Sequence, residues 1–204
     1  MYFIKTPKYI QQLFPGFTWS YSLKNKVIYL TFDDGPIPES TPGILDVLRR
    51  YNARATFFCV GDNIQKHPTL FRQIIKEGHA IGSHTHNHLS GWTSSSERYV
   101  ENVHKAAELA QSELFRPPYG RIRPKQAKIL SKDYQIVMWD VLSGDFDEAI
   151  NEEMCFNNVI NNATDGSIIV FHDSIKTKNK VDIVLPKVLE YYLSRGFTFN
   201  AIEN

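Results

Sequence analysis

The stretch Val27-Ile28-Tyr29-Leu30-Thr31-Phe32-Asp33-Asp34-Gly35-Pro36 joins an apolar run to a pair of acidic residues. Its first six residues are mainly β-branched, aromatic or aliphatic, which predicts a buried strand over 27–32. The sequence Asp33-Asp34-Gly35-Pro36 is ordinary turn chemistry. Two adjacent carboxylates also repel each other, and a bound divalent cation would remove that cost. The segment alone therefore fits a simple turn and a metal site equally well.

Strand-like and helix-like segments alternate along the rest of the chain. Predicted strands cover 27–32, 55–60, 79–82, 114–115, 135–139, 167–171 and 197–201, and predicted helices cover 41–51, 68–77, 94–113, 124–133, 152–162 and 182–195. This alternation predicts an α/β fold with a parallel sheet covered by helices. Asp33, His84, Arg116, Asp145 and His172 all follow predicted strands, whose carboxyl ends converge on one face in a barrel. We therefore expect a distorted (β/α) barrel of about seven parallel strands.

The length predicts one domain with a short extension. A chain of 204 residues without a Pro/Gly/Ser-rich linker is read as a single domain. Residues 1–25 are expected to form an N-terminal arm packed on the barrel, with a helix that begins at Thr6-Pro7. Residues 26–204 are expected to form the barrel domain. Within it, Ser94 and Glu97 form a capping box that predicts the start of the long helix over 94–113.

Charge and composition exclude several kinds of partner. The 23 basic and 22 acidic residues are intermingled and give a net charge of +1, which predicts no binding to nucleic acid. No segment is apolar enough to span a membrane, and the N-terminus lacks the pattern of a secretory signal, which predicts a cytoplasmic protein. Cys59 and Cys155 have no motif spacing and are expected to be free thiols. The sequence does not indicate an oligomeric state.

The sequence His84-Thr85-His86-Asn87-His88 is a candidate for metal binding. His84 and His88 are four residues apart, a spacing that can direct two imidazoles at one ion. With Asp34 they would form a His₂-carboxylate set with one position left for water, as in catalytic zinc sites. Asp33 would then remain free as a general base. His86 is expected to point away, and a merely polar surface loop is the alternative interpretation of this segment.

Two further segments carry candidate catalytic groups. Arg116-Pro117-Pro118-Tyr119 follows a predicted strand, and its prolines could fix the Tyr119 N–H as an oxyanion donor. Arg116 could bind a carboxylate through its two-pronged guanidinium. Taken alone, this segment also fits a simple turn. His172 follows an apolar strand and is a candidate general acid, because imidazole titrates near neutral pH. His67, His79 and His104 are expected to be ordinary surface or hydrogen-bonded histidines.

Taken together and in order, these segments resemble a known family. The resemblance rests on Thr31-Phe32-Asp33-Asp34-Gly35-Pro36, His84-Thr85-His86-Asn87-His88, Arg116-Pro117-Pro118-Tyr119, Trp139 with Asp145-Phe146, and Val170-Phe171-His172. These motifs look like those of the polysaccharide deacetylases, which form carbohydrate esterase family 4 or the NodB homology domain. The resemblance covers about residues 26–200. It implies a deformed barrel and the metal-dependent hydrolysis of an N-acetyl amide on an amino sugar.

The resemblance also implies a role for each motif residue. It makes Asp33 the base, and Asp34, His84 and His88 the ligands of one divalent metal. Arg116 would orient Asp33, the Tyr119 N–H would be the oxyanion donor, and His172 would be the acid, tuned by Asp145. The wall of the acetyl slot would consist of Trp139, Phe146 and Val170. The implied metal is zinc, although cobalt or nickel would also suit these ligands. Phe146 and Val170 stand where the family usually has Trp and Leu, which predicts a reshaped acyl pocket.

The implied substrate is an N-acetylglucosamine-containing poly- or oligosaccharide of the chitin or peptidoglycan type, from which acetate is released. Two alternatives remain open. One is an amidase of the same barrel superfamily that acts on a small non-sugar amide. The other is a carbohydrate-binding relative that keeps the fold without turnover, against which the intact Asp33 and His172 argue.

Overall fold

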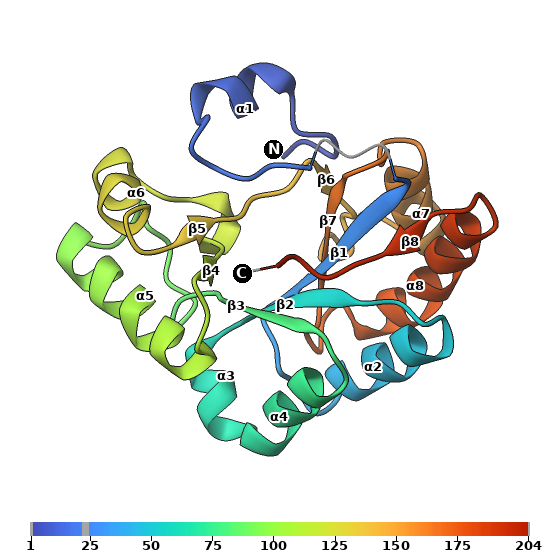
Figure 1. Cartoon of the computed structure of the whole chain (residues 1–204), viewed down its shortest axis with the longest axis horizontal. Helices are drawn as coiled ribbons and strands as arrows, with labels where there is room; N and C mark the ends of the chain where they lie inside the picture. Colours follow the sequence, from blue (N-terminus) through green and yellow to red (C-terminus); the bar gives the residue numbers. More distant parts are fainter. Residues whose placement is uncertain (1, 22–24, 204) are drawn as a thin grey trace.

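Seven parallel strands form one curled sheet in the computed structural model, which describes residues 2–21 and 25–203 (Figure 1). The strands are β1 (Val27–Asp33), β2 (Ala55–Cys59), β3 (Ala80–Ser83), β4 (Leu114–Phe115), β5 (Gln135–Ile136), β6 (Val141–Leu142) and β7 (Ile168–His172). Their spatial order is β5-β4-β3-β2-β1-β7-β6, and a further short strand, β8 (Thr198–Phe199), pairs with the first residues of β1. The predicted distorted (β/α) barrel is confirmed.

Helices cover the outer face of this sheet (Figure 1). They are α1 (Lys8–Leu13), α2 (Thr41–Arg50), α3 (Gly61–Lys66), α4 (Pro68–Lys76), α5 (Ser96–Ala110), α6 (Pro124–Leu130), α7 (Glu152–Ile160) and α8 (Lys178–Leu193), with a 3-10 turn at Pro118–Gly120. Helix α3 was not predicted from the sequence. The N-cap predicted for α5, Ser94, is also wrong, because the Ser95 hydroxyl accepts from the Arg98 N–H.

The strand predicted over 135–139 is too long, because β5 covers only residues 135–136, and β6, at the opposite end of the sheet order, was not predicted. The N-terminal segment lies between β5 and β6 (Figure 1). The Met138 N–H donates to the Thr18 carbonyl at 2.7 Å, and the Leu142 N–H donates to the Ile4 carbonyl at 2.8 Å. The arm therefore supplies backbone partners where the sheet is open. The boundary between an arm of 1–25 and a domain of 26–204 stays a prediction, and residues 1, 22–24 and 204 lie outside the described residues.

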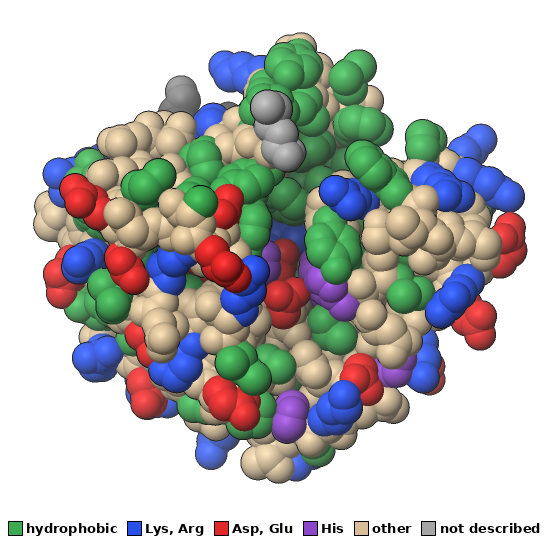
Figure 2. Space-filling model, turned by 180° about the vertical axis from the view of Figure 1, so that it is seen from behind, with side chains coloured by type: hydrophobic (Ala, Val, Ile, Leu, Met, Phe, Trp, Pro, Cys, Tyr) green, Lys and Arg blue, Asp and Glu red, His purple; other side chains and the backbone are tan. Residues whose placement is uncertain are grey.

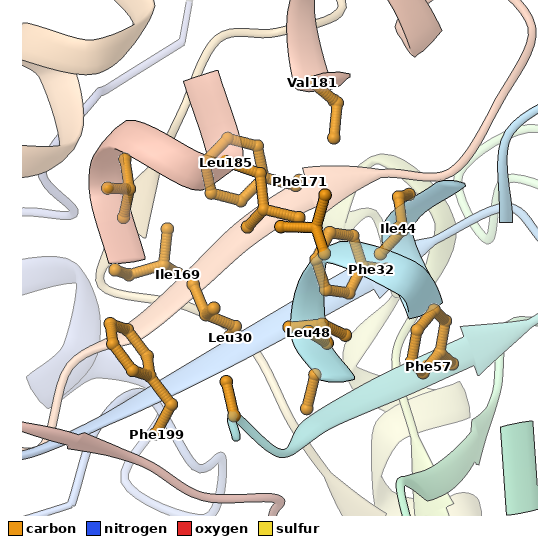
Figure 3. Close-up of a cluster of buried hydrophobic side chains, with 14 of the residues drawn as sticks. Leu30, Phe32, Ile44, Leu48, Phe57, Ile169, Phe171, Val181, Leu185 and Phe199 are labelled. Carbon is orange, nitrogen blue, oxygen red and sulfur yellow. The ribbon is translucent and has the colours of Figure 1, made fainter. Parts of the chain in front are cut away.

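Alternation along β1 decides which side chains reach the barrel interior. Leu30 and Phe32 point outward into the main hydrophobic core, between the sheet and helices α2 and α8 (Figure 3). Both side chains are fully buried, and each stabilises the fold by roughly 1.5–3 kcal/mol relative to exposure. Because side chains on a strand alternate between faces, Thr31 and Asp33 point inward, where both meet Arg116. The core thus fixes the direction of Asp33.

Two predictions from composition can be compared with the structure. Cys59 and Cys155 are buried free thiols, as expected, and burial raises the pKa of both. Among the residues described, no helix has the length and apolar character needed to cross a membrane.

Candidate active site

The carboxyl ends of the strands bring the predicted residues together. Asp33 ends β1 and Asp34 follows it, His84 and His88 follow β3, Arg116 follows β4, Asp145 follows β6, and His172 ends β7. One cavity of about 350 Å³ is lined by Asp33, Asp34, His84, His88 and His172. Its remaining wall consists of Tyr2, Tyr119, Arg121, Trp139, Leu142, Phe146 and Val170. Figure 2 shows this hollow, with acidic and histidine side chains inside it and hydrophobic side chains around it.

Asp34, His84 and His88 form a group suited to a metal ion. One ligand atom from each lies within 4.8 Å of the other two. Among the residues that the structure describes, the buried Asp34 Oδ1 has no hydrogen-bond partner, although the His88 Nε2 lies 3.1 Å away. A buried carboxylate oxygen without a partner is costly, and a cation would satisfy it. One carboxylate and two imidazoles are also the donor types that zinc prefers, so these residues fit the implied metal.

The orientation of His84 is set by a second contact. Its Nδ1 lies 2.8 Å from the Arg116 carbonyl oxygen, which can only accept, so Nδ1 carries the proton. The Nε2 lone pair is then free to face Asp34, 3.9 Å away. Burial lowers the pKa of His84 to about 4, so the ring is neutral near pH 7. A neutral imidazole fixed through its far nitrogen is the form in which histidine binds metals.

Asp34 is held in an unusual conformation. Its φ of 87° lies in the left-handed region, which non-glycine residues rarely adopt and which recurs at functional sites. Burial alone would raise the pKa of Asp34, but the neighbouring imidazoles of His88, His172 and His84 outweigh that effect and lower the pKa well below its usual value. The carboxylate is therefore ionised across the working pH range.

Asp33, although adjacent in sequence, has different partners. Its Oδ1 accepts from Arg116 Nη1 at 2.7 Å, and only 3% of the residue is exposed. Arg116 is fully buried and rests on the Phe58 ring, with 4.0 Å between its guanidinium carbon and the ring centroid. The same Nη1 also donates to the Thr31 hydroxyl, while Nε and Nη2 donate to the Val137 and Met138 carbonyls. Arg116 thus binds one oxygen of Asp33 and leaves the other, Oδ2, facing the ligand group at 3.9 Å from His84 Nε2.

His172 and Asp145 lie on another side of the same cavity. The His172 Nδ1 is 2.8 Å from Asp145 Oδ1, and the His172 backbone N–H donates to Asp145 Oδ2 at 2.7 Å. Burial alone would lower the pKa of His172, but the charge and hydrogen bond of Asp145 outweigh it and raise the pKa to about 10. The imidazole is therefore protonated at neutral pH and can deliver a proton through Nε2.

The predicted slot residues lie around this pair and around Tyr119. Trp139, Phe146 and Val170 all line the cavity, and the Phe146 ring meets the His172 ring edge-on at 5.4 Å between centroids. Tyr119 has a φ of 61°, and its side chain is 61% exposed. Non-glycine residues rarely adopt this left-handed backbone conformation, which recurs at functional sites.

Several residues of the site were missed from the sequence. Tyr2, Leu142 and Arg121 line the cavity although none belongs to a motif. Tyr2 comes from the arm, where its hydroxyl donates to Asp147 Oδ2 at 2.6 Å and its ring lies 5.1 Å from that of Phe146. Such long-range contacts leave no local pattern, so sequence periodicity could not have found them.

Asp173 directly follows His172 and was given no predicted role. Its Oδ1 accepts from the Gly35 N–H at 2.8 Å, and its Oδ2 accepts from the Thr41 hydroxyl at 2.7 Å. A Cβ at Gly35 would lie 1.8 Å from Oδ2, so a side chain at that position is excluded by this close approach. Burial raises the pKa of Asp173 to about 8. The residue ties the end of β7 to the turn that carries Asp34.

The remaining histidines have ordinary surroundings. The His79 Nδ1 accepts from the Ala55 N–H at 3.2 Å, and the His104 Nδ1 lies 2.8 Å from the Tyr134 hydroxyl. His67 lies between α3 and α4. His86 is buried and lies outside the metal-ligand group found among the described residues.

A parallel barrel with an Asp-His-His group, a buried carboxylate and a protonated histidine at its strand ends is the architecture of a hydrolase. The chain belongs to the polysaccharide deacetylase family, carbohydrate esterase family 4, because the family profile described as "Polysaccharide deacetylase" matches residues 20–137. It is 37% identical over 189 residues to a peptidoglycan-N-acetylglucosamine deacetylase of Bacillus cereus, covering 89% of each chain.

Two further comparisons extend this result. The chain is 37% identical over 158 residues to a chitooligosaccharide deacetylase of Azorhizobium caulinodans, covering 72% of this chain and 73% of that protein. The crystal structure of the Bc1960 peptidoglycan N-acetylglucosamine deacetylase has a TM-score of 0.87 and 31% identity, covering 92% of this chain and 91% of that one. Some curated relatives are longer, and this chain spans 38% of their length.

Proposed function

We propose that the protein is a metal-dependent hydrolase that removes N-linked acetyl groups from an N-acetylglucosamine-containing saccharide and releases acetate. One observation carries the proposal. The adjacent carboxylates of Asp33 and Asp34 have separate partners, since Asp33 is bound by Arg116 while Asp34 joins His84 and His88. A free base, a ligand group and a proton donor around one cavity are the parts that amide hydrolysis requires. The similarity to the peptidoglycan and chitooligosaccharide deacetylases supports the same conclusion.

Asp34, His84 and His88 would hold the metal, which when bound would polarise the amide carbonyl and acidify a water molecule. Asp33 takes a proton from the attacking water, and Arg116 keeps its carboxylate in place. The Tyr119 N–H donates to the oxygen that becomes negative as the water oxygen bonds to the acyl carbon.

His172 gives its Nε2 proton to the nitrogen as the carbon–nitrogen bond breaks, which leaves acetate and a free amino sugar. Asp145 keeps His172 protonated until that step. Trp139, Phe146 and Val170 enclose the acetyl methyl group and exclude bulkier acyl groups.

Zinc is the metal that we propose, on the basis of the donor types, and cobalt or nickel would bind the same group. Acetate release should stop when a chelator strips the metal and return when zinc is added. Activity that is insensitive to chelation, in protein without zinc by elemental analysis, would contradict the ligand assignment. The cytoplasmic location inferred from the sequence stays a prediction.

Acetate release from N-acetylglucosamine oligomers and from peptidoglycan fragments is the direct test. Asp33→Asn should abolish release from metal-loaded protein, whereas Asp46→Asn, an exposed acidic residue on α2, should leave it unchanged. Full activity of Asp33→Asn would remove Asp33 from the mechanism. Small cyclic and linear amides, offered in parallel, test the amidase alternative. If zinc-loaded protein binds glycans but releases no acetate, the alternative of a non-catalytic carbohydrate-binding protein is supported.

A further inference from the structure

Arg121 is a cation at the mouth of the cavity, with no anionic partner within residues 2–21 and 25–203. Its side chain lines the cavity and is exposed, and it makes neither a hydrogen bond nor an ion pair with the residues that the structure describes. Arg116 and Arg123 differ from it, because Arg116 binds Asp33 and Arg123 donates to the Trp92 carbonyl. The five donors of the Arg121 guanidinium are therefore available to a ligand.

Two aromatic rings hold Arg121 in place. Its guanidinium carbon lies 5.1 Å from the Trp92 ring centroid and 5.7 Å from the Tyr119 ring centroid. Both aromatic side chains are themselves exposed, Trp92 by 57% and Tyr119 by 61%. Cation–π contacts of this kind restrict the side chain without using its donors. A preorganised guanidinium loses less freedom on binding a ligand, which favours recognition.

The position of Arg121 relative to the ligand group limits what it can contact. The Tyr119 ring meets the His88 ring at 4.7 Å between centroids, so Tyr119 contacts both Arg121 and that metal-ligand candidate. The two contacts in series place the guanidinium carbon within about 10 Å of the His88 ring. A substituent on the sugar next to the reacting one can span this separation.

We propose that Arg121, flanked by Trp92 and Tyr119, binds a carboxylate on the sugar next to the one that is deacetylated. This inference rests on the proposed function and narrows its substrate to an anionic amino-sugar glycan. A carboxylate matches the planar fork of arginine and makes charge-assisted hydrogen bonds. A neutral chitin-type chain offers the guanidinium only hydroxyl and amide oxygens, which accept hydrogen bonds but do not compensate its charge. Peptidoglycan strands from which the stem peptides have been removed carry a suitable group, the free lactyl carboxylate of muramic acid.

Arg121→Gln tests the proposal with substrates that differ in one charge. The substrates are peptidoglycan disaccharide fragments with a free lactyl carboxylate, the same fragments as methyl esters, and neutral N-acetylglucosamine oligomers. For the free acid, kcat/KM should fall about ten- to a hundred-fold, mainly through KM, as expected for the loss of a charge-assisted hydrogen bond. The ester and the neutral oligomers should change less than about two-fold, because a neutral oxygen forms a weaker hydrogen bond with the guanidinium and no ion pair. Arg121→Lys should recover part of the loss.

Lys132→Gln is the matched control. Lys132 is an exposed basic residue that precedes β5, at the opposite end of the strands from the site, so this variant removes one positive charge without touching the cavity. It should leave all three substrates unaffected. Equal losses of Arg121→Gln on charged and neutral substrates, or no loss on either, would overturn the proposal.

Binding separates this inference from the proposed function. Titration calorimetry with the zinc-loaded Asp33→Asn protein should show tighter binding of the free acid than of the ester, and Arg121→Gln in that background should remove the difference. Equal affinities would overturn the inference even if acetate release is observed. If binding depends on the charge but the protein releases no acetate from any substrate, the proposed function is contradicted, while the carboxylate site at Arg121 is supported.

Discussion

Replacing Arg116 with methionine removes the charge that holds Asp33 and keeps most of the apolar stem. In the wild-type protein the guanidinium is fully buried and donates to Asp33 Oδ1 and to the Thr31 hydroxyl, each at 2.7 Å. It also donates to two backbone carbonyls of the segment after β5. Arg116→Met therefore leaves a buried carboxylate without its counter-ion and two carbonyls without donors.

The expected loss of stability follows from the ion pair and hydrogen bonds that Arg116→Met removes. Breaking a buried ion pair from one side typically costs about 3–5 kcal/mol, because one charge stays buried without compensation. Asp33→Asn should cost less, about 1.5–3 kcal/mol, because the asparagine oxygen still accepts from Arg116. The double variant buries neither charge, so its loss should be smaller than the sum of the single losses by at least about 1 kcal/mol.

Urea unfolding of the three metal-free variants and the wild type measures these differences as shifts of the midpoint at constant slope. For a chain of this size, Arg116→Met should also lower the melting temperature by roughly 6–20 °C. Zinc-loaded Arg116→Met should release little acetate, since Asp33 is no longer held. If the two single losses add within about 0.5 kcal/mol, the pair is not coupled and this account of Arg116 is wrong.

Three further changes have defined outcomes. Asp145→Asn should lower the pKa of His172, so the basic limb of the plot of kcat/KM against pH should move to lower pH. The value of kcat should fall about 10²–10⁴-fold. A basic limb that does not move would contradict this prediction. Gly35→Ala forces a methyl group onto a buried carboxylate and should destabilise the metal-free protein by about 1–3 kcal/mol in urea, whereas Gly43→Ala, where the nearest atom is at 3.5 Å, should not. Burial lowers the pKa of His79 to about 4, below the unfolded value of 6.5, so stability falls as the pH drops from 6.5 toward 4. Relative to His79→Asn, the wild type should lose about 3 kcal/mol over that range, and parallel curves of unfolding free energy against pH would refute it.

The sequence predicted those parts of the site that follow from strand ends. Asp34, His84 and His88 each come directly after a strand with a recognisable apolar pattern, and parallel strands place their carboxyl ends on one face. Periodicity was therefore sufficient to bring these three residues together. Their roles as ligands came from the spacing and from the family resemblance.

Residues placed by long-range packing could not be predicted in this way. Tyr2 reaches the cavity because the arm pairs with the chain around β6, and no local signal records that pairing. Arg121 follows the Pro118–Gly120 turn, whose geometry sets the direction of the next side chain. The segment after β5 read as one strand because Val137 and Met138 are apolar, although it leaves the sheet path to meet the arm.

The pairing of β1 with β7 explains why Asp33 and His172 face the same cavity. Asp33 is the register partner of His172, and Phe32 is the partner of Phe171. Partners in neighbouring parallel strands point to the same face, so the two phenylalanines enter the outer core while the proposed base and acid both face the cavity. A slip of one residue would exchange these faces and bury Asp33 against the helices. The phenylalanine pair, at 6.1 Å between ring centroids, therefore supports the register that directs Asp33 and His172 into the cavity.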